Sequence, residues 1–132
     1  MGPKGQQTIL VVEDDPLVQT MIVRVLKKMD FNVLKADDGD SALQICERRD
    51  WMIHLLMTDV LMPGMTGIEL AETVRSKAPH VKVLFLSGYM DGAVPSGVSL
   101  EQMGEFLQKP ASREELLDKV RDILQSSGGE PC

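Results

Sequence analysis

The chain has 132 residues, 43% of them hydrophobic, and a formal net charge of −6. This length suits one domain with one hydrophobic core, and no apolar run approaches the roughly 18 residues that a membrane span requires. Because no signal-peptide pattern opens the chain and its charge is acidic, we expect a cytoplasmic location, no membrane contact and no direct binding of nucleic acid.

The first part of the chain alternates strand-like runs with an amphipathic helical pattern. Residues 1–7 are polar and predict a flexible lead-in, whereas Thr8–Val12 is a continuous run of β-branched residues and leucine, typical of a central parallel strand. Pro16 suits the first turn of a helix. The apolar residues of that helix step at helical spacing, and they are Leu17, Met21, Val25 and Met29. Phe31–Leu34 then predicts a short second strand.

The middle of the chain repeats this alternation. Residues 37–40 predict a turn that leads into a second helix. The inner face of that helix is expected to carry Ala42, Leu43, Ile45 and Cys46, with Cys46 as a small core residue. Ile53–Met57 predicts the third strand, and Ile68–Lys77 predicts the third helix after a loop.

The last part of the chain predicts two strands and one helix. Val81–Leu86 is the fourth strand-like run, and Glu105–Leu107 is a weak fifth. The final helix is predicted over Ser112–Leu124, and it starts with the capping-box pattern S-x-x-E. Residues 126–132 predict a flexible tail.

Strands that alternate with helices imply an α/β fold, a doubly wound parallel sheet with helices on both faces. Ligand sites in such sheets lie beyond the carboxyl ends of the strands. Glu13, Asp14 and Asp15 follow the first strand-like run and Asp59 follows the third, so carboxylates converge on one edge. Like charges repel and lose hydration there, and a hard divalent cation such as Mg²⁺ would compensate.

Ser87 and Lys109 also lie just after strand-like runs and are expected at the same edge. A lysine places a point charge near anionic oxygens, and a serine hydroxyl donates a hydrogen bond. A carboxylate beside a metal, a lysine and a hydroxyl can accept a phosphoryl group whose charge is neutralised from several directions.

Four strings occur in this order along the chain: ILVVEDDP at 9–16, MTDVLMPGMTG at 57–67, LSG at 86–88 and QKP at 108–110. With them, residues 8–125 resemble the receiver domain of two-component response regulators. The resemblance implies a flavodoxin-like, five-stranded parallel sheet in the order 2-1-3-4-5. It also implies a phosphorelay switch, which accepts a phosphoryl group from a histidine kinase or a histidine phosphotransfer domain and promotes its own dephosphorylation without turning over an external substrate.

The resemblance implies a metal set around the phosphoacceptor. Asp59 matches the phosphoacceptor and a Mg²⁺ ligand, and Glu13 and Asp14 match the acidic pair that holds the ion. The backbone carbonyl of Leu61 matches the third protein ligand. Asp15 is an alternative member of the pair, although its place before a proline suits a helix N-terminus better.

The resemblance also implies phosphoryl-binding and switch residues. Ser87 and Lys109 match the residues that contact the phosphoryl group, and the bond between Lys109 and Pro110 is cis in the family. Phe106 matches an aromatic switch whose ring turns inward when Ser87 moves, and a plain core residue is its alternative. Tyr89 and Pro110 flank the site, where Tyr89 either shields the phosphoryl group or covers the surface.

Residues 88–104 depart from the family pattern. The family has a regular fourth helix here as part of its signalling face, whereas this stretch carries glycines and a proline that oppose a long helix. A homodimer through the 88–125 face is therefore an open question. The stretch from Leu86 to Pro110 is more similar to receivers attached to hybrid sensor histidine kinases than to those fused to DNA-binding domains.

Two other functions compete with the switch. One is a receiver-fold binding module that acts without phosphorylation, although every required side chain is present. The other is a phosphatase with an aspartyl-phosphate intermediate. Such enzymes place a second acid two residues after the nucleophile, and here that position is Leu61, which cannot transfer protons.

Overall fold

The chain alternates strands and helices, as predicted. A computed structural model describes residues 7–62, 64–87, 105–108 and 112–129. The elements in chain order are β1 Thr8–Val12, α1 Pro16–Lys28, β2 Asn32–Ala36, α2 Gly39–Arg48, β3 Leu55–Asp59, α3 Gly67–Lys77, β4 Lys82–Ser87, β5 Glu105–Gln108 and α5 Arg113–Gly129. No helix in the described ranges is long and apolar enough to span a bilayer.

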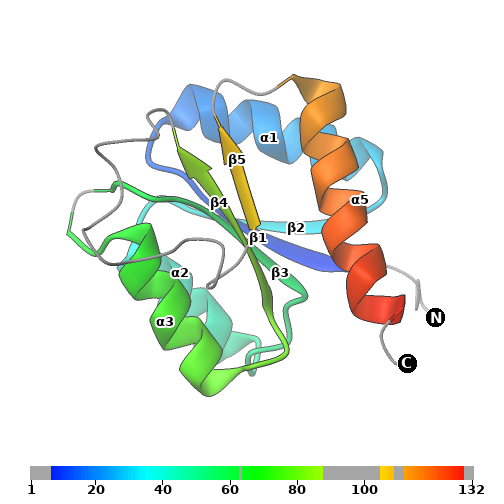
Figure 1. The fold of residues 1–132 in the computed structure, drawn as a ribbon. Coiled ribbons are helices and arrows are strands. Elements are labelled where there is room, and N and C mark those ends of the chain that lie inside the picture. The colour runs from blue at the N-terminus through cyan, green and yellow to red at the C-terminus, as the bar shows by residue number, and fades with distance from the viewer. Residues whose placement is uncertain (1–6, 63, 88–104, 109–111, 130–132) are drawn as a thin grey trace.

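The strands form one parallel sheet in the order β2-β1-β3-β4-β5, which confirms the predicted topology (Figure 1). Strands β1 and β3 are buried along their whole length, as expected where helices cover both faces of a parallel sheet. Strand β3 begins and ends two residues later than predicted. Its polar end residues stay in the sheet because neighbouring strands pair with them: Thr58 lies between Val12 of β1 and Phe85 of β4, and Asp59 pairs with Leu86 of β4.

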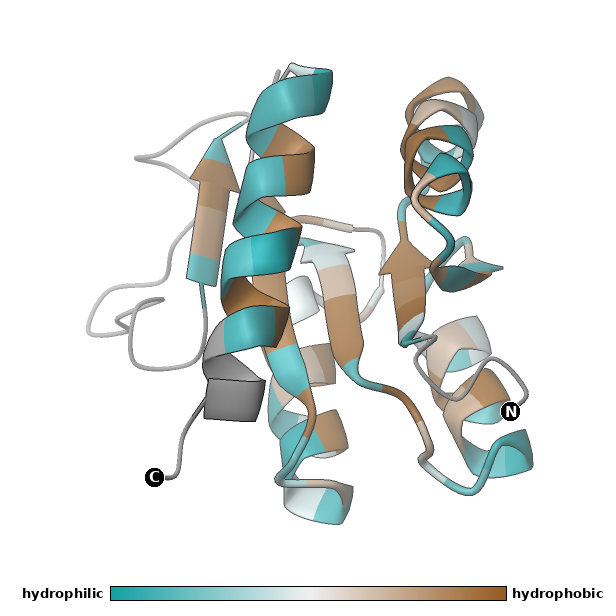
Figure 2. Ribbon diagram, turned by 90° about the vertical axis from the view of Figure 1, so that its right-hand side faces the viewer, coloured by the Kyte–Doolittle hydropathy of each residue, from teal (hydrophilic) through white to brown (hydrophobic). Residues whose placement is uncertain are grey.

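Helices α1 and α5 cover one face of the sheet, and α2 and α3 cover the other (Figure 1). Successive strand residues point to opposite faces, so Leu10 and Val12 pack in the α2/α3 core while Ile9 and Val11 pack in the α1/α5 core. Figure 2 shows the result, with strands that are mostly hydrophobic between helices of mixed hydropathy. Cys46 is fully buried in the α2/α3 core, which confirms its predicted place.

Helix α1 turns a different face inward from the one that the apolar spacing suggested. Its buried residues are Gln19, Ile22, Val25 and Leu26. Leu17 is 81% exposed and Met21 is 45% exposed. The reason is geometric: a series with a spacing of four residues advances about 40° past a full turn at each step, so it drifts away from the sheet.

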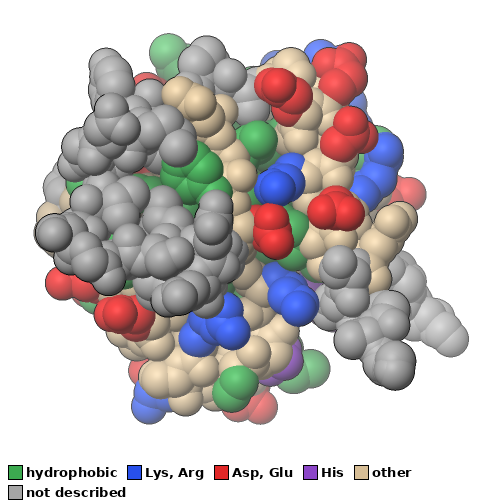
Figure 3. Space-filling model, viewed as in Figure 1, with side chains coloured by type: hydrophobic (Ala, Val, Ile, Leu, Met, Phe, Trp, Pro, Cys, Tyr) green, Lys and Arg blue, Asp and Glu red, His purple; other side chains and the backbone are tan. Residues whose placement is uncertain are grey.

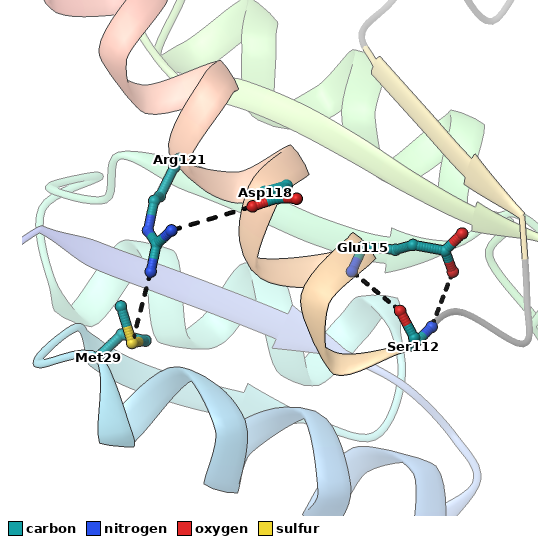
Figure 4. Close-up of polar contacts among 5 residues, drawn as sticks. All are labelled: Met29, Ser112, Glu115, Asp118 and Arg121. Carbon is teal, nitrogen blue, oxygen red and sulfur yellow. Dashed lines mark hydrogen bonds and ion pairs between the residues drawn. The ribbon is translucent and has the colours of Figure 1, made fainter.

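Helix α5 begins with the predicted capping box (Figure 4). The Glu115 backbone N–H donates to the Ser112 hydroxyl at 3.0 Å, and the Ser112 backbone N–H donates to the Glu115 carboxylate at 2.9 Å. The helix extends past its predicted end at Leu124 as far as Gly129. Near its middle, an Arg121 nitrogen lies 3.8 Å from the Met29 sulfur, where the end of α1 approaches α5.

Side chains of both signs lie side by side over α5 (Figure 3). Lys119 pairs with Glu105 of β5 at 3.1 Å, and Arg121 lies 3.9 Å from Asp118. Such exposed pairs are worth little individually. The mixture nevertheless keeps this surface free of a large field of one sign.

Candidate functional site

Three carboxylates meet at the carboxyl end of the sheet. Glu13 and Asp14 directly follow β1, and Asp59 is the last residue of β3. One carboxylate oxygen from each lies within 4.8 Å of the others. Glu13 is 1% exposed and Asp59 is 5% exposed, whereas Asp14 is open to solvent. The predicted convergence of these three acids is confirmed.

The loop after β1 is held by hydrogen bonds from its backbone N–H groups to a carbonyl and to two carboxylates. The Glu13 N–H donates to the Ala36 carbonyl at 3.1 Å, and the Glu13 carboxylate accepts the Asp15 N–H at 3.0 Å. The Asp15 carboxylate in turn accepts the N–H groups of Leu17 at 2.9 Å and Val18 at 3.4 Å, so it caps α1. Asp15 therefore serves the helix N-terminus, as its place before Pro16 suggested, and lies outside the carboxylate cluster.

A buried amide joins this loop to the end of β2, and the sequence prediction missed it. The Gln19 side-chain nitrogen donates to the Glu13 carbonyl at 3.1 Å and to the Ala36 carbonyl at 3.0 Å. It also lies 3.0 Å from the Asp37 carboxylate. Gln19 is only 6% exposed. The available signal was its helical register with Ile22, which places a polar residue on the inner face of α1.

The backbone of Asp59 is fixed by the start of α3. The Gly67 N–H donates to the Val60 carbonyl at 2.8 Å. A Cβ atom on Gly67 would meet the Asp59 carbonyl oxygen, so only glycine allows this approach. Thr66 and Glu69 close a capping box at 3.1 and 3.0 Å and hold the first turn of α3 in place.

The backbones of two further predicted residues border this end of the sheet. Leu61 lies in the loop two residues after Asp59, and its side chain is 59% exposed. The preceding Val60 N–H donates to the Leu86 carbonyl at 3.0 Å. Ser87 is the last residue of β4, one beyond the Leu86 that pairs with Asp59. The metal role of the Leu61 carbonyl and the phosphoryl role of Ser87 stay predictions.

Phe106 lies on β5 opposite Phe85 of β4. It is partly buried and packs against the α2/α3 core. Its switch role stays a prediction. Lys109, Pro110, Tyr89 and the stretch 88–104 lie outside the described residues, as does the predicted cis bond. Strand β5 ends at Gln108, level with Ser87, so the chain leaves the described sheet at the carboxylate end just before Lys109.

Hydrogen bonding or burial shifts the pKa values of Asp38, Cys46 and His54, which lie outside the carboxylate cluster. The backbone and side-chain hydrogen bonds of Ser41 hold the pKa of the Asp38 carboxyl below its usual range, because Asp38 caps α2. Burial raises the pKa of the Cys46 thiol to about 11, and the Glu47 carboxylate adds to the rise. Burial, with a smaller effect of the His80 charge, lowers the pKa of His54, whose Nδ1 accepts the Thr8 N–H at 3.0 Å.

The carboxylate cluster suits a hard cation. All three side chains offer oxygen, and neither histidine nor cysteine takes part among the described residues of the cluster. Mg²⁺ and Ca²⁺ prefer oxygen ligands, whereas structural zinc sites use sulfur and nitrogen. Glu13, Asp14 and Asp59 could therefore hold a divalent ion of the first kind.

Comparisons with known proteins agree with this geometry. The family model of the response regulator receiver domain matches residues 9–121. The response regulator receiver protein CpdR of Brucella abortus is 30% identical over 116 residues, which cover 88% of this chain and 95% of CpdR. The crystal structure of the receiver domain from the hybrid histidine kinase CckA has a TM-score of 0.76 at 36% identity, covering 89% of this chain and 99% of that chain.

Other relatives are much longer. The sensor kinase CckA of Brucella abortus is 33% identical over 121 residues, which cover 92% of this chain and 13% of the kinase. The cyclic di-GMP phosphodiesterase of Thermotoga maritima is 30% identical over 119 residues, which cover 90% of this chain and 31% of that protein. The chain thus spans well under half the length of these two relatives.

Proposed function

The chain belongs to the response regulator receiver domain family, and on that premise we propose that it is a phosphorelay switch in which Asp59 accepts a phosphoryl group from a phosphohistidine. The observation that carries the proposal is the joint position of Glu13, Asp14 and Asp59, with carboxylate oxygens within 4.8 Å of one another at the carboxyl end of the sheet. Like charges held this close repel one another, and a bound divalent cation would relieve that repulsion.

In the proposed transfer, a carboxylate oxygen of Asp59 attacks phosphorus. The new oxygen–phosphorus bond forms while the nitrogen–phosphorus bond of the phosphohistidine breaks, and the imidazole leaves with that electron pair. Bound Mg²⁺ would supply positive charge against the oxygens of the transferring group. Glu13 and Asp14 would hold the ion with the Leu61 carbonyl. Gly67 and the α3 capping box keep the Asp59 backbone in place, so the nucleophile is positioned before the donor arrives.

The proposed switch runs from Asp59 towards β5. Ser87, at the end of β4, and Lys109 would contact the added phosphoryl oxygens. Phe106 already packs partly against the α2/α3 core, so its ring has further area to bury. Moving the ring fully inward could contribute about 1–2 kcal/mol, which shifts a two-state equilibrium by roughly tenfold. The surface around β5 would change in consequence.

The proposed partner is a histidine kinase or a histidine phosphotransfer domain, in the cytoplasm. The receiver protein CpdR and the sensor kinase CckA both carry a segment similar to this chain. We propose that the domain hydrolyses its own acyl phosphate. It turns over no external substrate in this proposal, because phosphatases with an aspartyl-phosphate intermediate need a second acid two residues after the nucleophile, and that position is Leu61.

The test is incubation of the chain with a small phosphodonor and Mg²⁺, followed by intact-mass measurement. We expect a mass gain of one phosphoryl group, which hydroxylamine removes because an acyl phosphate is labile. Asp59→Asn should abolish the gain, and Glu72→Gln on the exposed side of α3 is the matched control. No mass gain in the wild-type chain would favour the binding module without phosphorylation. An acid-stable label that persists in Asp59→Asn would contradict the assignment of the acceptor.

A further inference from the structure

A hollow of 410 Å³ lies between helix α1 and the edge strand β2, and the carboxylate cluster contributes nothing to its lining. The lining residues are Thr20, Val23, Arg24, Lys27, Lys28 and Lys35. Those from α1 recur every three or four positions, so they form one stripe of the helix. Lys35 of β2 alternates with Leu34, which packs in the α2/α3 core, and therefore lies on the α1 face of the sheet.

The charge of the hollow is unusual for this chain. The whole sequence has 14 lysines and arginines against 20 acids, yet the hollow is lined by four cations and no carboxylate. None of these four cations forms an ion pair with a carboxylate in the part of the chain that the structure describes. The overall composition therefore does not explain why four cations line this hollow.

Favourable interaction with the helix dipole explains only two of the four cations. Lys27 and Lys28 lie in the last turn of α1, where cations interact favourably with the helix dipole. Arg24 lies a full turn earlier, and Lys35 lies on a strand. Arg24 and Lys28 are also four residues apart on one helix, a spacing at which like charges destabilise the helix. An anion between them would relieve that repulsion.

We propose that this hollow binds a compact polyanion, a small molecule with two or more phosphate groups. Its volume is in the range of small-molecule sites. The Arg24 guanidinium can bind phosphate oxygens in a bidentate manner, the lysines add point charges, and the Thr20 hydroxyl can donate. No aromatic ring is among the lining residues given above, so phosphate groups and not a stacked base would be recognised.

A compact ligand fits better than a long one. Beyond the hollow, the rest of the chain carries the excess of acid that makes the net charge −6. A nucleic acid or an extended acidic peptide would meet that negative field, whereas a small polyanion contacts the four cations alone. Binding here does not use Asp59, so it is independent of the proposed phosphoryl transfer.

The test is isothermal titration calorimetry with inorganic tripolyphosphate, in buffer freed of metal ions on a chelating resin so that no divalent ion links the probe to the carboxylate cluster. We expect saturable binding by the wild-type chain and by Asp59→Asn, weakening as salt is added. Arg24→Gln/Lys35→Gln should lose about tenfold in affinity or more, since charged hydrogen bonds are lost at two positions. Arg48→Gln/Arg49→Gln removes the same charge at exposed positions at the end of α2 and should leave the affinity unchanged.

Three results would overturn the proposal. One is the absence of tripolyphosphate binding by the folded wild-type chain. Another is an equal loss of affinity in both double variants, which would mean that only net charge matters. The third is tighter binding of a hexaglutamate peptide or of a short DNA duplex than of tripolyphosphate, which would identify a macromolecular partner instead. Circular dichroism of each variant checks that the fold is retained.

Discussion

The carboxylate cluster gathers negative charge at the end of the sheet, and the hollow between α1 and β2 gathers positive charge. The two sites differ in how their charged side chains are held. Glu13 and Asp59 are almost fully buried, and backbone hydrogen bonds and a close glycine contact fix their surroundings. The cations of the hollow lie on exposed, flexible stems. Fixed, buried charges repel strongly and select a ligand by geometry, whereas exposed charges repel weakly and select by charge. The first arrangement suits a metal ion and the second a polyanion.

Gly67→Ala should have the largest effect on stability, because it perturbs the surroundings of the carboxylate cluster and leaves the hollow between α1 and β2 unchanged. The added Cβ would meet the Asp59 carbonyl, and backbone cannot yield as a side chain can. We expect a loss of about 3 kcal/mol in the free energy of unfolding, measured with urea. Tripolyphosphate binding at the hollow should persist under native conditions. Gly64→Ala is the control: nothing lies near its Cβ position, so only its positive φ of 78° matters. An equal loss in both variants would contradict the close contact.

Mg²⁺ should stabilise the chain through the buried cluster. Free Mg²⁺ at about 100 times its Kd adds about 2.7 kcal/mol to the free energy of unfolding, which thermal unfolding can measure. Asp14→Asn removes a charged ligand and should shrink this effect, and Asp40→Asn, an exposed acid in α2, should not. An undiminished Mg²⁺ response in Asp14→Asn would count against the site.

Gln19→Leu tests how the cluster is positioned. The substitution leaves the Glu13 and Ala36 carbonyls without their side-chain donor, which should cost about 2 kcal/mol of stability. Gln44→Leu, the same change at an exposed position of α2, should cost far less. A purely structural role for Gln19 would leave the Mg²⁺ affinity of the folded protein unchanged. We expect that affinity to fall, because the loop carrying Glu13 and Asp14 loses a tether.

The smallest expected effect concerns pH and lies away from both charge groups, at the amino end of β3. The folded pKa of His54 is lowered from 6.5 by burial first and by His80 second. The unfolded state therefore takes up the proton first, so stability is fully present above pH 6.5 and falls as the pH drops below it. Urea unfolding at pH 8 and pH 5.5 measures the loss, which should be smaller in His54→Gln. A wild-type difference that His54→Gln fully retains would assign the effect to other groups.

Short sequence patterns correctly predicted the features that depend on residues close together in the chain. The capping box at Ser112, the helix cap at Asp15 and the buried Cys46 each depend on residues a few positions apart or on a strongly apolar pattern. The end of β3 was misplaced because Thr58 and Asp59 are polar, and the neighbouring strands β1 and β4 keep them in the sheet. Local pattern carries no information about those neighbours.

The alternation of strands and helices and the position of acids after the first and third strands could be predicted from the sequence, because hydrophobic periodicity follows directly from backbone geometry. Only the tertiary structure decided how these acids are held. It brought buried Gln19 onto the Glu13 carbonyl and required glycine at position 67. These outcomes depend on distances between segments far apart in the chain, which the packing of the whole sheet sets.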